Sequence, residues 1–195
     1  MDKLLSIIQG SKSFLDIGAN VGNFSMFMRR TFPEMEILML EANLFCDKAL
    51  EATGIPYEIV CLSNEEKEVK FYYEDTNFHG TGASYYLEKT PHYSKQQHSL
   101  LKTRMLDDVV GDRSFDFIKM DTQGSELDIL RGGTKTVAKA KYVLLELSLV
   151  EYNENAPLKA EVMEYMKSIG FEPLELIDVH YHNGIMIQED WIFTK

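Results

Sequence analysis

Apolar and polar positions change along the chain in blocks that predict strands and helices in alternation. Short apolar runs at 13–17, 36–40 and 57–62 predict three buried strands. Apolar residues at helical spacing predict a helix over 23–31, and a second helix is expected from about residue 44 to residue 52. Buried strands joined by helical connections are typical of the α/β class, in which a parallel sheet carries helices on its faces.

The alternation is interrupted in the middle of the chain. An additional strand is predicted at 69–73 and another at 100–106. The segment 74–99 between them is polar and rich in aromatic and turn-forming residues. A segment of this length inside a compact domain is usually either a functional lid or a disordered loop.

The alternation resumes in the second half of the chain. Strands are predicted at 115–120 and 142–147, and helices at 125–130 and 157–168. Two last strands, at 171–179 and 185–193, flank His182-Asn183-Gly184, which is a strong hairpin signal. We therefore expect one domain over 1–195, a doubly wound sheet that ends in an antiparallel pair.

The charge balance excludes several classes of protein. The 195 residues include 20 Lys and Arg against 31 Asp and Glu, a formal net charge of −11. A chain this acidic lacks the basic surface that holds phosphate backbones, so no nucleic-acid partner is expected. No apolar run approaches the roughly 18 residues that span a bilayer, and the amino-terminal residues lack the layout of a secretory signal. The composition predicts an acidic, cytoplasmic protein without a membrane partner.

The most informative motif follows the first predicted strand. Asp16 lies at the end of that strand, and Gly18 and Gly22 lie in the loop before the next helix. In a doubly wound sheet ligands bind at this junction, where glycines let the backbone approach a ligand and the first amides of the helix face it. The dinucleotide pattern G-x-G-x-x-G is excluded, because Asn20 stands where its second glycine is needed.

Two acids at strand ends indicate which ligand the loop binds. Asp16 would repel a pyrophosphate but suits an ammonium group, and Glu41, at the end of the second strand, can accept hydrogen bonds from both hydroxyls of a ribose. S-adenosylmethionine, an amino acid joined to a nucleoside, carries both the ammonium group and the ribose hydroxyls. Ser63 and Asn64 follow the third strand, where they would meet the adenine amino group or form an ordinary turn. The alternative is a tight turn at the glycines, with Glu41 capping a helix.

These motifs resemble those of the FkbM-type family of class I, S-adenosylmethionine-dependent methyltransferases. The resemblance rests on DIGANVGNFS at 16–25, Glu41-Ala42-Asn43, Leu106-Asp107-Asp108 and IKMDTQGSELDILRGG at 118–133. It implies a Rossmann-like, seven-stranded, mostly parallel sheet with an antiparallel last strand, and methyl transfer to a hydroxyl of a small molecule or glycan. The residues expected to bind the cofactor are Asp16, Gly18, Ala19, Asn20, Gly22, Asn23, Glu41, Ala42, Ser63, Asn64 and Asp121.

Three acids in the second half of the chain are candidates for catalysis. Asp121 follows the strand at 115–120 and Glu146 lies in the strand at 142–147, so both would reach the edge of the sheet that carries the glycine loop. Asp121 is the first candidate for a general base, with Glu126 as a second. Asp121 could instead cap the next helix, and Glu126 could be a solvated acid in its first turn. Asp121 and Glu146 could also hold a divalent cation such as Mg²⁺.

The remaining marked residues concern the acceptor. His79, Ser84, Tyr85 and Tyr86 lie in the possible lid and would shape an acceptor pocket, although a plain surface loop fits them equally well. His180 and His182 flank the last hairpin turn and are expected to be exposed.

Two other functions stay open from the residues alone. The first is N-methylation of an amine or a protein side chain, and the second is a non-catalytic module that binds a nucleoside. The glycine loop together with acids at the two later strands favours the enzyme.

Overall fold

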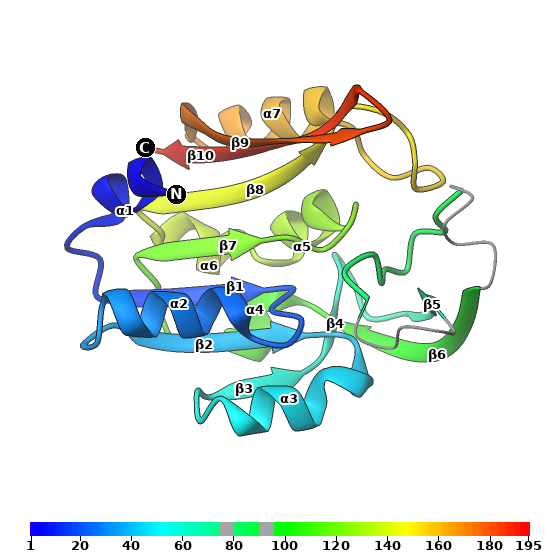
Figure 1. Cartoon of the computed structure of the whole chain (residues 1–195), viewed down its shortest axis with the longest axis horizontal. Helices are drawn as coiled ribbons and strands as arrows, with labels where there is room; N and C mark the ends of the chain where they lie inside the picture. Colours follow the sequence, from blue (N-terminus) through cyan, green and yellow to red (C-terminus); the bar gives the residue numbers. More distant parts are fainter. Residues whose placement is uncertain (75–79, 90–95) are drawn as a thin grey trace.

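The computed structural model describes residues 1–74, 80–89 and 96–195 and is built on a seven-stranded sheet (Figure 1). In spatial order the strands are β3 (Tyr57–Ile59), β2 (Glu36–Glu41), β1 (Ser13–Ile17), β7 (Phe117–Met120), β8 (Tyr142–Ser148), β10 (Ile185–Thr194) and β9 (Glu172–His182). Strands β3, β2, β1, β7 and β8 are parallel, whereas β10 is antiparallel to both of its neighbours. The predicted α/β class, with an antiparallel last strand, is therefore confirmed.

Helices cover both faces of this sheet, and each face has its own apolar core. Successive side chains of a strand point to opposite faces, so Phe14 and Leu15 belong to different cores. Phe14 packs with α1 (Asp2–Ile8), α2 (Asn23–Thr31) and α3 (Asp47–Ala52). Leu15 packs with α4 (Leu106–Val110), α5 (Glu126–Gly132), α6 (Thr134–Lys139) and α7 (Lys159–Ser168). In Figure 1 the first set lies in front of the sheet and the second set behind it.

A second, three-stranded sheet lies beyond the carboxyl ends of the parallel strands (Figure 1). It consists of β4 (Cys61–Leu62), β6 (Gln96–Arg104) and β5 (Glu68–Glu74), in that order. The prediction of one strand over 57–62 is wrong, because the chain passes from the large sheet to the small one at Val60. The run 57–62 holds no glycine or proline that would signal such a change of sheet.

Other elements differ from the prediction in their bounds or were not predicted. Helices α1 and α6 were not expected. The strand expected at 100–106 runs instead from Gln96 to Arg104. A short 3₁₀ helix, η1 (Leu44–Cys46), precedes α3 in place of one continuous helix over 44–52. The helix over 23–31 is confirmed to the residue.

The order of the strands places a crevice between β1 and β7. The chain leaves β1 toward β2 and β3 on one side, and continues from β7 toward β8 on the other. Ligands of doubly wound sheets bind outside the carboxyl ends of the strands at such a reversal. Among the described residues, no helix is long and apolar enough to cross a membrane.

Candidate active site

Gly18 lets the loop after β1 approach the end of β7. Its φ of 79° lies in the left-handed region, and a Cβ at this position would lie 1.9 Å from the main-chain oxygen of Asp121. No side chain fits in that space. The amides of Gly18 and Ala19 both donate to the main-chain oxygen of Leu40, at 2.9 and 3.2 Å. The glycine of the sequence motif therefore joins the ends of β1, β2 and β7.

Glu41, at the end of β2, holds this loop from the other side. Its Oε2 accepts a hydrogen bond from the Asn20 amide at 2.6 Å, and its Oε1 accepts one from the Asn43 amide at 2.8 Å. The residue is 8% exposed, and burial raises the pKa of its carboxyl. The Ala42 amide is a further donor to this carboxylate. Since each carboxylate oxygen has two lone pairs, Glu41 keeps acceptor capacity for a ligand.

A cavity of about 650 Å³, counting the part that is open to solvent, lies beside Glu41. Apolar walls come from the strand ends and α5, through Ile17, Leu40, Val60, Leu62, Phe71 and Ile129. Polar groups come from Asn20, Glu41, Ser84, Tyr85, Asp121, Thr122 and Gln123. The cavity therefore lies at the crevice that the strand order predicts.

The expected cofactor residues divide into those that line the cavity and those that do not. Gly18, Asn20, Glu41, Ala42 and Asp121 line it. The others lie outside the lining, namely Asp16, Ala19, Gly22, Asn23, Ser63 and Asn64. Several of these shape the structure around it, since the Gly22 amide donates to the Ala19 oxygen at 2.8 Å and Gly22 precedes the first residue of α2.

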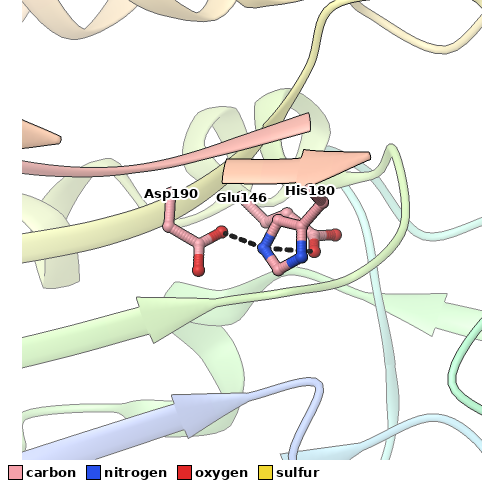
Figure 2. A group of neighbouring side chains, drawn as sticks. All are labelled: Glu146, His180 and Asp190. Carbon is pink, nitrogen blue, oxygen red and sulfur yellow. Dashed lines mark ion pairs between the residues drawn. The ribbon is translucent and has the colours of Figure 1, made fainter. Parts of the chain in front are cut away.

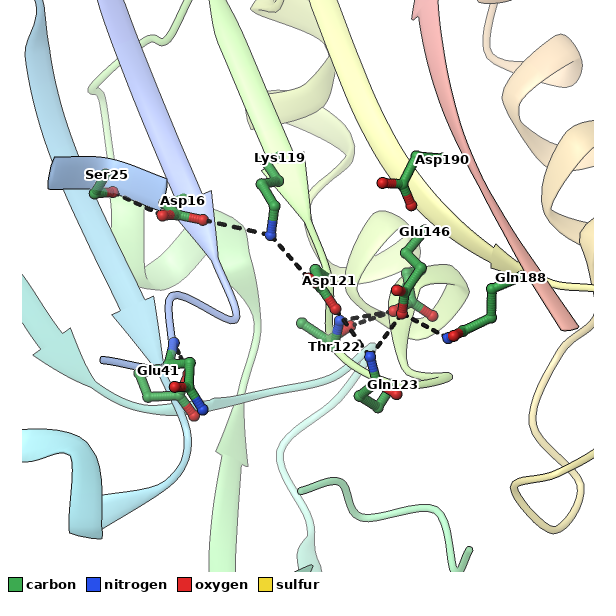
Figure 3. A network of polar contacts seen from close by, with 12 residues as sticks. Asp16, Ser25, Glu41, Lys119, Asp121, Thr122, Gln123, Glu146, Gln188 and Asp190 are labelled. Carbon is green, nitrogen blue, oxygen red and sulfur yellow. Dashed lines mark hydrogen bonds and ion pairs between the residues drawn. The ribbon is translucent and has the colours of Figure 1, made fainter. Parts of the chain in front are cut away.

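Asp16 is fully buried and faces other residues of the protein (Figure 3). Its Oδ2 accepts a hydrogen bond from the Ser25 hydroxyl at 2.7 Å, and its Oδ1 lies 3.9 Å from the Lys119 ammonium. Burial raises the pKa of Asp16, although Lys119 and Ser25 act against this. Asp16 lies outside the residues that line the cavity, and the cation nearest to it is Lys119 of the chain, so its contact with the ammonium group of a ligand stays a prediction.

Lys119, which sequence reasoning missed, lies at the centre of this network. It projects from β7 on the face that carries Asp16 of the neighbouring strand, its direct partner in the register. Its ammonium lies 3.1 Å from Asp121 Oδ2 and 5.3 Å from the centre of the Phe24 ring. Burial opposes the charge, but Asp121 and Asp16 raise the pKa of Lys119, which is therefore a cation at neutral pH. The one available signal was a lysine inside an otherwise apolar strand.

Asp121 stays ionised and does not cap a helix. Ser125, not Asp121, is the residue before α5. The Asp121 carboxylate accepts hydrogen bonds from Lys119 Nζ at 3.1 Å and from Gln123 Nε2 at 2.9 Å. Burial would raise the pKa of Asp121, but Lys119 and these hydrogen bonds outweigh it and hold that pKa below its ordinary value.

Gln123 connects Asp121 with Glu146 (Figure 3). Its Nε2 donates to Asp121 Oδ1 at 2.9 Å and to Glu146 Oε2 at 2.6 Å. The Tyr152 hydroxyl donates to Gln123 Oε1 at 3.0 Å, which fixes the orientation of the amide. The two acids that the sequence proposed as a cation pair are thus joined by an amide nitrogen, and the Mg²⁺ hypothesis for Asp121 with Glu146 is not supported.

Glu146 is held in β8 by amides and surrounded by acids. Gln188 Nε2 donates to its Oε2 at 2.6 Å, alongside Gln123, and Gln188 also contacts the Tyr152 hydroxyl. Burial and then the neighbouring carboxylates, Asp121 first among them, raise the pKa of Glu146 well above its ordinary value. The partner that a buried acid in this strand requires is therefore a pair of glutamine amides.

Glu126 is buried, which corrects its interpretation as a solvated acid. It is 4% exposed, and its Oε1 accepts hydrogen bonds from the amide and the hydroxyl of Thr122 at 2.8 and 3.0 Å. Its Oε2 accepts one from the Gly124 amide at 3.0 Å. Burial raises the pKa of Glu126 to about 7. Glu126 therefore fixes the loop 122–124, which presents Gln123 to the two acids.

Part of the possible lid packs against this site. His79 lies outside the described residues. Ser84 is 1% exposed and pairs with Tyr72 of β5, and the hydroxyls of Tyr85 and Tyr86 both donate to Asp128 Oδ2 of α5 at 2.9 Å. The Tyr85 hydroxyl also lies 3.4 Å from the Ser63 hydroxyl. Ser84 and Tyr85 thereby form one wall of the cavity, whereas Tyr86 anchors the segment from outside it.

Comparison with known proteins gives a family match over most of the chain. The model of the methyltransferase FkbM domain matches residues 16–173. A curated relative, the 2-O-methyltransferase NoeI of Sinorhizobium fredii, is 41% identical over 64 residues, which are 31% of this chain and 26% of that protein. The matched region therefore spans about a quarter of that relative.

Solved structures with the same fold are distant in sequence. An uncharacterized protein from Listeria monocytogenes serotype 4b superposes with a TM-score of 0.58 at 12% identity, over 99% of this chain and 65% of that one. Magnesium protoporphyrin IX methyltransferase from Synechocystis, determined with bound SAM, superposes with a TM-score of 0.55 at 10% identity and covers 100% of this chain and 77% of its own. TrmK from M. capricolum, in complex with S-adenosyl-homocysteine, also has a TM-score of 0.55 at 10% identity, with 100% of this chain and 66% of that chain covered. At these identities the likeness concerns the fold.

Proposed function

This chain belongs to the FkbM methyltransferase domain family, and from that premise we propose that it transfers a methyl group from S-adenosylmethionine to a hydroxyl group of a small molecule or glycan. The observation that carries the proposal is the position of Glu41, whose carboxylate keeps acceptor capacity and lines a largely apolar cavity at the β1–β7 crevice. The hydroxyl acceptor is supported by the printed name of the relative, a 2-O-methyltransferase.

The chemistry of the cavity fits the cofactor. The remaining acceptor capacity of Glu41 suits a ribose hydroxyl, and Val60, Leu62 and Phe71 offer apolar contact to a purine. Asp121 is ionised and lines the same cavity, so it suits an ammonium group better than the enclosed Asp16 does. When bound, the cofactor supplies a methyl group on a cationic sulfur, which a nucleophile attacks in one displacement.

The protein's own contribution is mainly orientation. Holding two reactants in line can supply on the order of 7–11 kcal/mol of a barrier. The β1–α2 loop and the segment 80–85 enclose one side of the cavity, and the loop 122–124, fixed by Glu126, places Gln123 and Asp121 at its edge. The acids of the rim disfavour a phosphate-bearing acceptor and therefore favour a neutral polyhydroxylated one.

In this proposal the Asp121 carboxylate is the general base that takes the proton from the acceptor hydroxyl. Glu126 is excluded from that role, because its oxygens are directed to the Thr122 and Gly124 donors. An ionised carboxylate with a lowered pKa is a weak base toward an alcohol. The acceptor hydroxyl therefore needs a second group that makes it more acidic.

Cofactor binding is tested by titration calorimetry with S-adenosylhomocysteine. Glu41→Gln should weaken binding by roughly 10- to 100-fold, since a hydrogen bond to a charged group contributes about 1.5–3 kcal/mol. The matched control is Glu36→Gln at the exposed other end of β2, which should bind like the unaltered protein. Equal affinity in all three proteins would contradict the cofactor site.

Acceptor class is tested separately, by the release of S-adenosylhomocysteine in the presence of candidate acceptors. Sugars and small alcohols should support turnover, whereas amines and peptides without a free hydroxyl should not. Turnover with amines alone would replace the proposal by N-methylation. Cofactor binding without turnover on any acceptor class would favour a non-catalytic nucleoside-binding module.

A further inference from the structure

Three side chains from adjacent strands converge beside the proposed active site. Glu146 of β8, Asp190 of β10 and His180 of β9 place one ligand atom each within 4.8 Å of the others (Figure 2). His180 Nε2 lies 3.3 Å from Asp190 Oδ1 and 3.9 Å from Glu146 Oε1. Asp190 and Glu146 are direct partners in the β8–β10 register, and His180 pairs with Gln188, two residues from Asp190. The cluster therefore rests on paired strands and not on loops.

The two oxygens of Glu146 have different surroundings. Gln123 and Gln188 both donate to Oε2 at 2.6 Å, whereas Oε1 is the oxygen nearest to His180. Hydrogen bonds to one oxygen fix the direction of the other, which is how outer partners orient the carboxylate ligands of metal ions. The glutamine amides thus aim Oε1 into the cluster.

His180 turns a ring nitrogen toward both acids. Although its ring edge reaches solvent, its Nε2 is enclosed and lies within ion-pair distance of Asp190 Oδ1, at 3.3 Å. The lone pair of a neutral imidazole nitrogen at this place could bind a cation that the two carboxylates share. The side chain of His180 is 41% exposed, so the expected exposure is met in part, while its Nε2 faces the two acids.

We propose that Glu146, His180 and Asp190 bind a divalent transition-metal ion of the Zn²⁺ or Mn²⁺ type. One imidazole nitrogen and two carboxylate oxygens suit such ions, whereas Mg²⁺ and Ca²⁺ prefer oxygen ligands alone. Ligand atoms bound to one ion at about 2.1 Å lie roughly 3.0–3.5 Å apart, so side-chain shifts of about 1 Å complete the set.

The charge of the surroundings favours a cation at this place. Two carboxylates of the cluster face one imidazole, and Asp121 lies beyond the Gln123 amide. A dication bound between Glu146 and Asp190 would offset the repulsion between the two carboxylates.

A metal ion here would supply the group that Asp121 lacks. Three protein ligands leave coordination positions open, and a hydroxyl bound at one of them becomes more acidic. The Gln123 amide joins Glu146 to Asp121, which lines the cavity, so the ion would lie next to the proposed acceptor. This catalytic role rests on the proposed function, whereas metal binding itself does not.

Metal binding is tested on untagged protein dialysed against chelator. Calorimetry should show one equivalent of Zn²⁺ or Mn²⁺ bound and no competition by millimolar Mg²⁺, and Co²⁺ should give a visible absorption band. His180→Gln and Asp190→Asn should each weaken binding by at least 100-fold. His182→Gln, on the same strand but outside the cluster, should leave it unchanged. Absence of stoichiometric binding, or equal binding by His180→Gln, would overturn the proposal.

The same proteins distinguish this proposal from the cofactor site. His180→Gln should retain the affinity for S-adenosylhomocysteine while losing the metal. If the unaltered protein binds the metal but not the nucleoside, the methyltransferase proposal fails and the metal site stands. If it binds the nucleoside but no metal, the metal site fails and the methyltransferase proposal stands.

Discussion

At the scale of single residues, Lys119 keeps one acid of the site, Asp121, ionised. Its ammonium lies between Asp16 and Asp121, and it keeps the pKa of Asp121 low while that of Glu146, farther along the network, is high. Removing one partner of a buried ion pair leaves the other charge unpaired, which is strongly destabilising. The lysine therefore stabilises the fold and sets the charge at the edge of the cavity.

The protonation of Glu126 leads to a prediction about stability. Its pKa is about 7 in the folded protein against an ordinary 4.5, a difference of 7 − 4.5, or about 2.5. Because the folded state holds this proton more tightly, its contribution is greatest below pH 4.5 and is lost as the pH rises toward 7. The loss is on the order of 3 kcal/mol.

Urea denaturation at pH 5 and pH 8 tests this prediction. The unfolding free energy of the unaltered protein should decrease from pH 5 to pH 8. In Glu126→Gln this decrease should be smaller, by on the order of 3 kcal/mol. Glu161→Gln in α7, whose acid is exposed, is the control and should behave like the unaltered protein. An identical fall in all three proteins would contradict the prediction.

The residues found from sequence and those missed differ in a physical respect. Glu41 and Asp121 are marked by their positions at strand ends, where the fold class predicts a ligand. Lys119, His180 and Asp190 lie inside strands, and their meeting depends on the order and register of strands that are far apart in the chain. Periodicity gives the face of a residue within its own strand but not its neighbour across the sheet.

At the scale of elements, Asp107 shows how one helix stabilises the start of another. This residue of α4 accepts hydrogen bonds from the Lys135 and Thr136 amides, at 3.0 and 2.8 Å, and from the Thr136 hydroxyl at 2.8 Å. It therefore caps α6, a helix that the sequence did not predict. The motif Leu106-Asp107-Asp108 was recognised, but its role was not, because the capped amides are 28 and 29 residues away.

Asp107→Ala should destabilise the protein by about 1–2 kcal/mol, the usual effect of losing a helix cap. Hydrogen bonds from these amides outweigh burial and lower the pKa of Asp107. Its contribution is therefore fully present above pH 3.8 and is lost as the pH falls below that value. Thermal or urea unfolding at pH 7 measures the effect, with Asp108→Ala, an exposed neighbour, as the control. Equal stability of the two variants would rule out the cap.

At the scale of the whole molecule, the acids of the site form a row across one sheet. Asp16, Asp121, Glu146 and Asp190 come from, or directly follow, four adjacent strands, and Figure 3 shows them facing a common space. In Figure 1, α1 and α2 lie over other parts of that face. A chain with a net charge of −11 thus gathers carboxyl groups beside its cavity, which favours cations and neutral acceptors over phosphates. Burial raises the pKa of Asp16, Glu146 and Asp190, whereas Asp121 stays ionised beside Lys119.

The segment 80–89 closes this space from the side of the small sheet. It is joined to β5 by the Tyr72–Ser84 pair and to the loop after β8 by the Glu88–Asn153 pair. Tyr85 and Tyr86 attach it to α5 through Asp128. Burial and then Asp128 raise the pKa of both tyrosines, so their hydroxyls keep their protons and donate.

Asp128→Ala should release this segment, because it removes the common acceptor of both tyrosine hydroxyls. Amide hydrogen exchange within 80–89 should become faster, and the affinity for S-adenosylhomocysteine should fall several-fold, since Ser84 and Tyr85 form one wall of the cavity. In the unaltered protein the same amides should exchange more slowly when the nucleoside is bound, as expected of a lid. Asp112→Ala, on an exposed turn, should change neither measurement. Unchanged exchange in Asp128→Ala, with and without ligand, would show that the segment is held by its backbone pairs alone and does not act as a lid.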